Sequence, residues 1–323
     1  MTKINWKRKS YCYGLSGLIL VMLPFLIPDL YLLHIINMIL ISSIVVLGMN
    51  IVMGYAGQFM LAQAAFYGVG AYTSAILATT LGLPFWICLP CAVVFTGLAG
   101  LLTSLPCLRV KGHYLAIVSL GVAVIIHEAI INMTNVTKGP SGIIDIPSPS
   151  IFGIEINTSI RYYYMLIILV CLSVLFISII MKSRVGRAFI AIRESVTAAE
   201  AMGINYRTYT VLAFVLSASF AGLGGSLYAH LVNYVSPDSF GISEVLSLLA
   251  MLVVGGIGTI SGPIIGSVIL GIGYEYLRSM QNLQMVIYGL IILIFVLFMP
   301  RGLVTFFKVF NYKKFQKIVK EKF

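Results

Sequence analysis

Residues 162–181 read YYYMLIILVCLSVLFISIIM and contain no charged side chain. An α-helix needs about 20 apolar residues to cross the hydrocarbon layer of a membrane, and this run has that length. Its apolar residues follow one another without the alternation of polar and apolar side chains that a membrane β-barrel strand requires. The run therefore predicts a transmembrane helix.

Further apolar runs of similar length lie on both sides of this one. The ten predicted helices cover residues 12–28, 31–53, 58–81, 84–106, 113–133, 162–181, 208–231, 241–258, 262–279 and 283–300. Of the 323 residues, 60% are hydrophobic and 10% are charged, whereas a soluble protein carries about 25% charged residues. So few charges cannot cover a surface that faces water. We predict an all-α polytopic membrane protein with about ten transmembrane helices, in which residues 1–323 form a single domain.

The basic residues predict how this chain is oriented in the membrane. Ten helices place both termini on one side, and the segments on that side contain 18 of the 21 Lys and Arg residues. Because Lys and Arg gather on the cytoplasmic side of membrane proteins, both termini are predicted to be cytoplasmic. This placement explains the net charge of +11. No basic stripe interleaved with aromatic residues indicates binding to nucleic acid.

The sequence lacks the motifs of several classes of enzyme. No Lys follows a Gly, so a Walker A loop is missing and the chain cannot itself be an ATPase. His127 and Glu128 are not followed by the second His, at residue 131, that a zinc protease helix requires. Cys88 and Cys91 have the spacing of a metal or redox pair, but no further ligands stand at suitable spacing. We expect no catalytic residue, metal site or cofactor in this chain.

Two loops stand out by their length. Residues 134–161 form an outer loop, and residues 182–207 form a cytoplasmic loop of helical composition. Within the second, residues 187–203 predict a short amphipathic helix that ends at Gly203 in the left-handed conformation. The residues that share one face of it are Ala188, Ile192 and Ala199. Such a helix lies either on anionic lipid or against another protein, and its many alanines, which bury little area in lipid, favour the protein.

The same loop resembles the coupling loop of ABC-importer permeases, which carries Glu-Ala-Ala, three further residues and then Gly. Here Thr197-Ala198-Ala199 precedes Gly203 by the same interval, with Thr in place of Glu and without the later Ile-x-Leu-Pro ending. Other stretches resemble the branched-chain amino acid permease family, and in particular its LivM-type subunit. They are residues 54–72, which begin GYAGQ, residues 108–116 (LRVKGHYLA), residues 253–266 (VVGGIGTISGPIIG) and residues 300–303 (PRGL).

This resemblance implies a permease subunit of an ATP-binding-cassette importer that moves branched-chain amino acids across the bacterial inner membrane. It also implies protein partners: a LivH-like sister permease, two cytoplasmic ATPase subunits that bind the ATP, and an extracytoplasmic substrate-binding protein. The helix over residues 187–203 would then dock on an ATPase subunit. The residues assigned to this coupling helix are Gly186, Arg187, Arg193, Ala198, Ala199 and Gly203.

Two glycine-rich segments, one in each half of the chain, are predicted at the cytoplasmic ends of helices. With two nearby amides they supply the candidates for the translocation path, which are Gly54, Gly57, Gln58, Gln63, Gly255, Gly258 and Gly262. In one interpretation these segments are broken or re-entrant, and their free backbone groups and amides meet a zwitterionic substrate. In the other, the glycines only allow helices to pack closely. The sequence leaves both interpretations open.

Two other functions stay open as well. A urea or amide permease of the same superfamily would share the pattern. An ion-coupled secondary transporter would need no ATPase, and carboxylates in the middle of the membrane would favour it. The ionisable residues His127, Glu128, Glu244 and Glu275 are instead predicted toward the outer ends of their helices. Their placement favours the ATP-driven importer.

Overall fold

The computed structural model describes residues 24, 29–110, 112–151, 154–156, 158–277, 284–298 and 302–303. Most of the first predicted helix, residues 12–28, and most of the basic tail lie outside the described residues. The helices are α2 (Leu30–Asn50), η1 (Ile51–Tyr55), α3 (Gln63–Thr80), α4 (Phe85–Cys107), α5 (His113–Asn132), α6 (Thr134–Thr137), η2 (Gly139–Ser141), α7 (Ser159–Lys182), α8 (Arg184–Glu194), α9 (Val196–Ala201), α10 (Tyr206–Val232), η3 (Pro237–Phe240), α11 (Ile242–Gly255), α12 (Ser261–Leu277) and α13 (Gln284–Phe298). Two short antiparallel strands, β1 (Ser150–Ile151) and β2 (Ile154–Glu155), form a hairpin.

The prediction of an all-α membrane protein is confirmed. Six helical segments are long and apolar enough to cross a membrane: Leu30–Tyr55, Phe85–Cys107, Tyr114–Asn132, Ser159–Lys182, Tyr206–Val232 and Pro237–Gly255. Three other predicted helices are shorter, with 18 residues in α3, 17 in α12 and 15 in α13. Helix α3 begins at Gln63 instead of residue 58, because Gly57 has a φ of 68° and the chain leaves the helical path there. The described residues thus contain six helices of spanning length, where ten were predicted along the whole chain.

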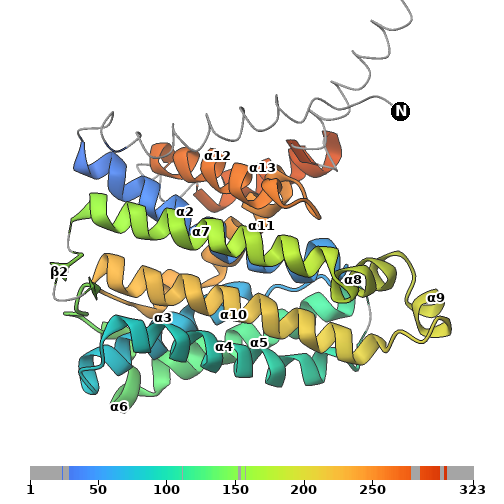
Figure 1. Ribbon diagram of the computed structural model, residues 1–323, viewed down its shortest axis with the longest axis horizontal. Helices are drawn as coiled ribbons and strands as arrows, with labels where there is room; N and C mark the ends of the chain where they lie inside the picture. Colours follow the sequence, from blue (N-terminus) through green and yellow to red (C-terminus); the bar gives the residue numbers. More distant parts are fainter. Residues whose placement is uncertain are drawn as a thin grey trace, which may run out of the picture.

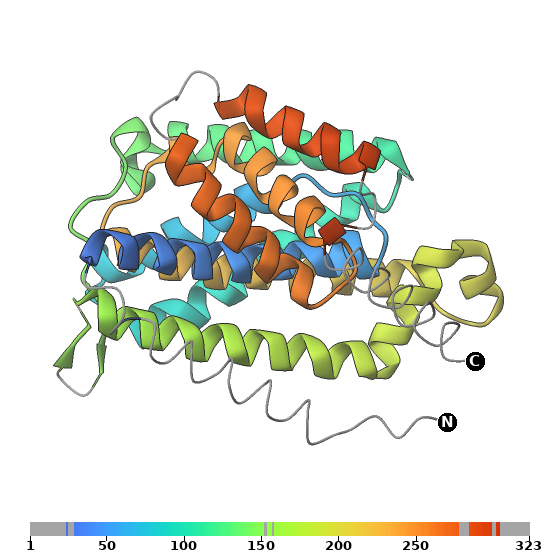
Figure 2. The same cartoon turned by 90° about the horizontal axis from the view of Figure 1, so that it is seen from above.

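The long helices run side by side along the long axis of the molecule (Figure 1). Helix α10 lies at the centre and contacts α2, α3 and α4, whereas α11 packs against α12 and α13. Seen from above, α7 lies on one flank of the bundle and the red helix α13 on the other (Figure 2). The two ends of the bundle differ. One carries α8 and α9 and is called the α8–α9 end below, and the other carries β1, β2 and α6 and is called the hairpin end.

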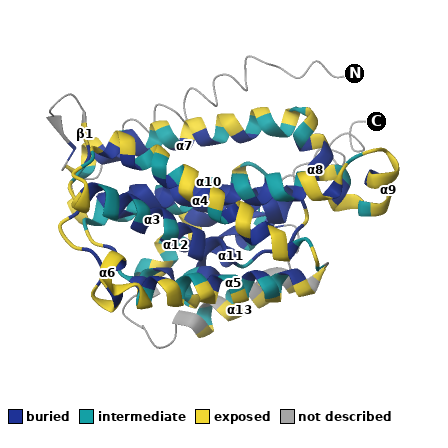
Figure 3. Cartoon of the chain, turned by 90° about the horizontal axis from the view of Figure 1, so that it is seen from below, coloured by how far each residue is buried: buried dark blue, intermediate teal, exposed yellow. Residues whose placement is uncertain are grey.

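Small residues bring the central helices into backbone contact. A side chain on Gly70 of α3 would overlap the backbone of Gly222 of α10, and one on Gly225 would overlap the Tyr67 carbonyl. In lipid, where no hydrophobic effect drives helices together, such close van der Waals contact is a main source of helix association. The centre of the bundle is accordingly buried, whereas α7 exposes a series of large apolar side chains (Figure 3).

A buried polar network holds the loop of residues 134–158 to the bundle at the hairpin end. His230 of α10 is buried, with its Nδ1 2.7 Å from the Pro147 carbonyl oxygen and its Nε2 2.9 Å from Ser74 Oγ. Ser74 Oγ also lies 2.8 Å from Ser226 Oγ. Because buried polar groups are costly unless they find partners, these contacts tie α3, α10 and the loop together.

Replacing His230 with leucine is expected to destabilise this end of the protein. The Pro147 carbonyl would lose its hydrogen-bond partner, and the Ser74 hydroxyl would lose one of its two. A buried polar group left unsatisfied costs about 1–3 kcal/mol of stability. Thermal unfolding in detergent measures the change. Tyr234→Phe is the matched control, because the Tyr234 hydroxyl donates to the Ser141 carbonyl at the exposed surface of the same end. Equal melting temperatures for the two variants would contradict the stabilising role of His230.

Candidate functional site

The predicted coupling helix consists of two helices in the structure. Helix α8 ends and α9 begins at Ser195, whose backbone is extended, with φ −162° and ψ 115°. The Ser195 hydroxyl accepts a hydrogen bond from the Ala198 amide at 3.3 Å and thereby caps α9. The prediction of one continuous helix over residues 187–203 is therefore wrong, because a serine at its middle acts as an N-cap.

The residues predicted to share one face, against lipid or another protein, pack against their own chain instead. Ala188, Ile192 and Ala199 are all buried, and the last two form a small core with Tyr206 at the start of α10. Gly203 has a φ of 78°, which is the left-handed conformation predicted for it. The chain therefore leaves α9 through a glycine turn and enters α10 with the pair of short helices held against its first residues.

Two residues assigned to the coupling helix, Gly186 and Ala199, lie in the interior of the chain. Ala199 packs in the small core just described, and Gly186 is buried where a side chain would overlap the Met181 backbone. Both face their own chain because the apolar side of an amphipathic pair seals against the bundle. The exposed residues of α8, α9 and the turn after them include Arg187, Thr197, Ala198, Glu200, Ala201 and Met202.

Arg193 connects α8 to both glycine-rich segments. Its Nη1 donates to the Gly54 carbonyl oxygen at 2.8 Å, and its Nη2 donates to Glu194 Oε1 at 2.9 Å. A Cβ atom on Gly57 would lie 2.5 Å from Arg193 Cγ, and one on Gly258 would lie 3.0 Å from Arg193 Nη1. The two segments were predicted only to occupy corresponding places in the two halves. In the structure they meet at one side chain of the loop.

Asn50, the last residue of α2, joins the same two segments. It is buried, its Nδ2 donates to the Thr259 carbonyl at 2.9 Å, and its Oδ1 accepts from the Gly258 amide at 2.8 Å. Gly54 needs to lack a side chain, because a Cβ atom there would overlap Asn50 Oδ1. Asn50 was missing from the residues predicted from the sequence. The sequence does contain an indication of its role, because Asn50 is a polar amide within an apolar run. Lipid offers no hydrogen-bond partner to such a group, so the protein must supply one.

The two glutamines predicted to line the path have different surroundings. Gln63 is completely buried: its Nε2 donates to the carbonyl oxygens of Val45 (2.9 Å) and Ser217 (3.3 Å), and its Oε1 accepts from the Ser217 hydroxyl (2.8 Å). Gln58 accepts at its Oε1 from the Tyr206 hydroxyl at 3.3 Å. Gln63 thus ties α2, α3 and α10 together, and Gln58 ties the residues after Gly57 to the start of α10. Contact of either amide with substrate stays a prediction.

Gly255 and Gly262 lie where α11 and α12 touch. A side chain on Gly255 would overlap the Gly262 carbonyl, and one on Gly266 would overlap the Met251 carbonyl. These pairs show that α11 and α12 run antiparallel, joined by a turn over residues 256–260. The break predicted here is present, and the helices on its two sides pack on each other. Of the path candidates, Gly54, Gly57, Gln58 and Gly258 therefore gather at the α8–α9 end, whereas Gln63 lies deeper between helices.

A half-buried glutamate lies where the chain enters α11, beside a cluster of aromatic rings. Phe240 of η3 packs on Gly68, and its ring centroid lies 5.1 Å from that of Tyr67 and 5.7 Å from that of Tyr228. Glu244 follows in the first turn of α11, four residues after Phe240. Within the described part of the chain, no residue donates a hydrogen bond to the Glu244 carboxylate or forms an ion pair with it.

The candidate membrane segment around Glu244 begins at Pro237 and not at residue 241, so Glu244 is its eighth residue instead of its fourth. Helix α11 has 14 residues, which cover about 21 Å, less than the roughly 30 Å of a hydrocarbon layer. Because residues 237–240 belong to the same candidate segment and α11 is shorter than the layer, we expect its first turn to lie within the membrane. A helix dipole stabilises an acid in the first turn by about 0.3–1 kcal/mol, whereas a charged side chain at the centre of a membrane helix costs about 2.5–3.5 kcal/mol. The dipole alone does not account for a glutamate here.

An all-helical membrane bundle whose glycine-rich breaks converge on a loop helix has the architecture of a transporter's membrane subunit. Residues 31–296 match the family described as branched-chain amino acid transport system / permease component. The chain belongs to this family.

The relatives include both permeases of such systems. The chain is 35% identical over 287 residues to the high-affinity branched-chain amino acid transport system permease protein LivM of Escherichia coli K12, an alignment that covers 82% of this chain and 68% of LivM. It is 26% identical to LivH of the same organism, over 81% of this chain and 90% of LivH. It is 24% identical to BraD of Pseudomonas aeruginosa, over 84% of this chain and 95% of BraD. No solved structure matches the chain.

Proposed function

We propose that this chain is the permease subunit of an ATP-binding-cassette importer for branched-chain amino acids. The observation that carries the proposal is the 35% identity to LivM, together with the family match over residues 31–296. A LivH-like sister permease completes the membrane part. Two ATPase subunits bind and hydrolyse the ATP, and an extracytoplasmic binding protein delivers the substrate. The chain itself carries no enzymatic step.

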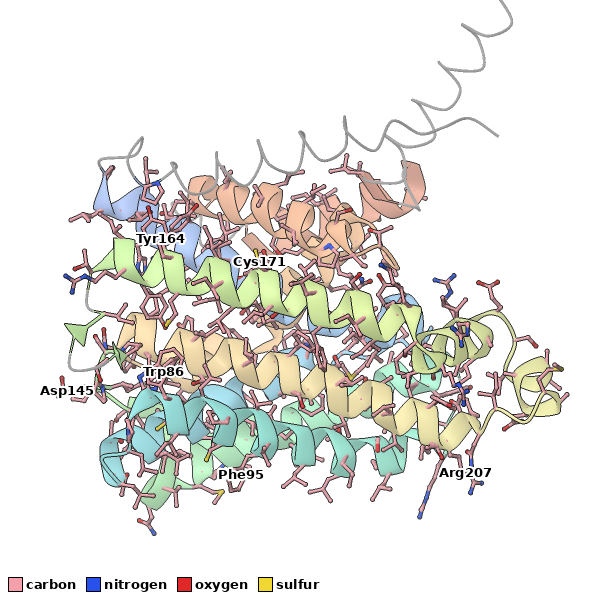
Figure 4. The ribbon with its side chains drawn as sticks, viewed as in Figure 1. Trp86, Phe95, Asp145, Tyr164, Cys171 and Arg207 are labelled. Carbon is pink, nitrogen blue, oxygen red and sulfur yellow. The ribbon has the colours of Figure 1, made fainter. Side chains whose placement is uncertain are left out.

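We place the protein in the bacterial inner membrane with the α8–α9 end and both termini in the cytoplasm. The described basic residues support this orientation, because Lys182, Arg184, Arg187 and Arg207 lie at the α8–α9 end. Arg207 and Asp145 lie at opposite ends of the bundle (Figure 4). In this proposal the three shorter helices α3, α12 and α13, with the segment predicted from the sequence over residues 12–28, bring the number of membrane segments of one permease domain to about ten.

Uptake by the reconstituted complex tests this function. Proteoliposomes that hold this chain, its sister permease and the ATPase subunits are supplied with the binding protein and a radiolabelled amino acid. We expect leucine, isoleucine or valine to accumulate only when ATP is present on the ATPase side. Accumulation driven by an ion gradient without ATP would indicate a secondary transporter. Transport of urea in place of the amino acids would indicate an amide permease.

The exposed face of α8 and α9 is the proposed docking surface for an ATPase subunit. These helices project beyond the ends of the long helices (Figure 1). Arg187, Ala198 and Ala201 are exposed there. Behind that surface, the small core with Tyr206 and the hydrogen bond from Arg193 to Gly54 hold the pair to the bundle. A partner that pushes on this face therefore acts on structured helices and not on a free loop.

Ala198→Trp is expected to prevent docking, because an indole on the exposed face keeps the ATPase backbone at a distance. The ATPase subunits that co-purify with the tagged permease should fall about tenfold or more, while the melting temperature of the permease stays unchanged. Ala199→Trp is the contrasting control, since overpacking the small core costs about 1–3 kcal/mol and lowers that melting temperature. Full co-purification with Ala198→Trp would support the interpretation that these helices lie on lipid.

A further inference from the structure

The aromatic residues around η3 form a connected cluster inside the bundle. The ring centroids of Tyr67 and Tyr228 are 5.6 Å apart, Phe240 meets both, and Tyr72 lies 6.3 Å from Phe240. The members come from α3, α10 and η3, so the cluster forms only when these elements assemble. It lies beside backbone that is not α-helical, between the end of α10 and the start of α11. Such backbone at membrane depth is tolerated where it lines a cavity or is buried in protein.

Two polar groups of this region have no protein partner among the described residues. The Tyr72 hydroxyl is buried without a hydrogen bond. The Glu244 carboxylate, on a half-buried residue one helical turn after Phe240, receives neither a hydrogen bond nor an ion pair from the described residues. A buried hydroxyl is normally satisfied, and a charged side chain in a membrane helix is costly without a partner. Two such groups in and beside one cluster therefore indicate a ligand or water that the protein accommodates there.

The chemistry of this region selects a cation. A carboxylate in low-dielectric surroundings favours an ammonium group, which donates up to three hydrogen bonds. Tyrosine rings attract cations through their π faces, and tyrosine hydroxyl oxygens accept hydrogen bonds. The apolar parts of the same rings suit an aliphatic side chain. An anionic or purely apolar ligand would leave the carboxylate unmatched.

We infer that Glu244, next to the aromatic cluster of Phe240, Tyr67 and Tyr228, binds the ammonium group of the amino acid during its passage through the membrane. This inference rests on the proposed function and adds to it a recognition site inside the permease. The site lies within the membrane on α11, away from the Arg193 contacts at the α8–α9 end. After the substrate leaves its binding protein, its ammonium group has Glu244 as a counter-ion in a region that contains little water. Glu244 is unpaired so that the substrate can pair with it.

Glu244→Gln in the complete reconstituted complex tests the site, because it keeps the size of the side chain and removes its charge. Leucine uptake should fall about tenfold or more, since one partner of a buried charge pair is lost. The melting temperature in detergent should stay equal or rise, because an unpaired charge leaves the membrane interior. Glu244→Asp keeps the charge and should recover part of the uptake. Glu128→Gln is the control, because Glu128 is an exposed glutamate of another membrane helix, α5.

Uptake by Glu244→Gln within twofold of wild type would overturn the inference. So would a loss of uptake that comes with a lower melting temperature or with loss of the ATPase subunits, since that combination indicates a structural role. Equal losses in Glu128→Gln would show a general need for charge and would also overturn it. If the wild-type complex moves no branched-chain amino acid, the proposed function fails first. If wild type transports leucine and Glu244→Gln does so equally well, only the ammonium site fails.

Discussion

Gly255→Ala is expected to prevent the native packing of α11 on α12, although it adds only one methyl group. That methyl would overlap the Gly262 carbonyl and approach the Gly266 amide nitrogen to 3.0 Å. Backbone atoms cannot move aside like the end of a flexible side chain, so the two helices would have to separate. Overpacking costs about 1–3 kcal/mol, and occasionally more, which is a large part of the roughly 5–15 kcal/mol that stabilises a folded protein. Purified yield and melting temperature in detergent should both fall.

Gly273→Ala is the matched control in the neighbouring helix. A Cβ atom on Gly273 of α12 would meet no other atom within 4 Å. Alanine favours an α-helix over glycine by about 0.5–1 kcal/mol, so the same substitution should leave the stability unchanged or raise it. The two variants are thus expected to change the melting temperature in opposite directions. A similar change in both would mean that helix propensity, and not the α11–α12 contact, decides the effect.

The packing of Gly255 on Gly262 also bears on the two interpretations that the sequence left open for the glycine-rich segments. Gly255 and Gly262 have a structural explanation, because each lies against backbone of the opposing helix. Gly57 and Gly258 have a different one, since both adopt positive φ angles in turns beside Arg193. Close packing and broken helices are therefore both present, at different glycines. A role of these residues in the path of the substrate stays a prediction.

The helical fold was predictable from the sequence because few backbone structures are stable in lipid. Backbone groups in the hydrocarbon layer need internal partners, so an uncharged run such as residues 162–181 becomes a helix. Helical periodicity also placed Ile192 and Ala199 on one face, and both are buried in the structure. Both signals are local: they depend on residues within one or two turns of each other.

The features that were not predicted depend on contacts between residues far apart in the sequence, or on backbone geometry, which local sequence patterns do not show. Ser195 fits a helical pattern, and only its extended backbone shows that it caps α9. Asn50 meets Gly258 and Thr259, which lie more than two hundred positions further along the chain. For Gln63, the sequence indicates a buried amide that needs partners. Only the fold shows that Val45 and Ser217 supply them.

The Arg193 contacts suggest how movement at the α8–α9 end reaches the membrane helices. Arg193 holds the Gly54 carbonyl just beyond α2, and Asn50 links that point to the turn before α12. In the proposed importer, we therefore expect a rigid displacement of α8 by the ATPase subunits to be passed to both halves of the chain at once. Coupling of this kind requires a continuous set of packed or hydrogen-bonded groups between the two sites. Here that set consists of one guanidinium group, one amide and the glycine turns around them.

Arg193→Ala is accordingly expected to separate ATP hydrolysis from transport. The Gly54 carbonyl loses its donor, and a void opens beside Gly57 and Gly258, so displacement of α8 is no longer passed on. Leucine uptake per ATP hydrolysed should fall about tenfold, within the range of about 5–150-fold for coupling between sites. The exposed face of α8 and α9 is unchanged, so the ATPase subunits should still co-purify. Arg193→Lys should be intermediate, because an ammonium group can donate to Gly54 but cannot reproduce the planar fork that also reaches Glu194.

Arg187→Ala separates this effect from a general loss of positive charge. Arg187 lies in the same helix, but its side chain is exposed and its Nη1 donates to the Lys182 carbonyl at 3.2 Å within the loop. It should keep the wild-type ratio of leucine moved to ATP hydrolysed, even if its position on the docking face weakens co-purification. Equal ratios in Arg193→Ala and Arg187→Ala would rule out the coupling role of Arg193. A parallel fall of hydrolysis and uptake in Arg193→Ala would do the same, because it indicates lost docking and not lost transmission.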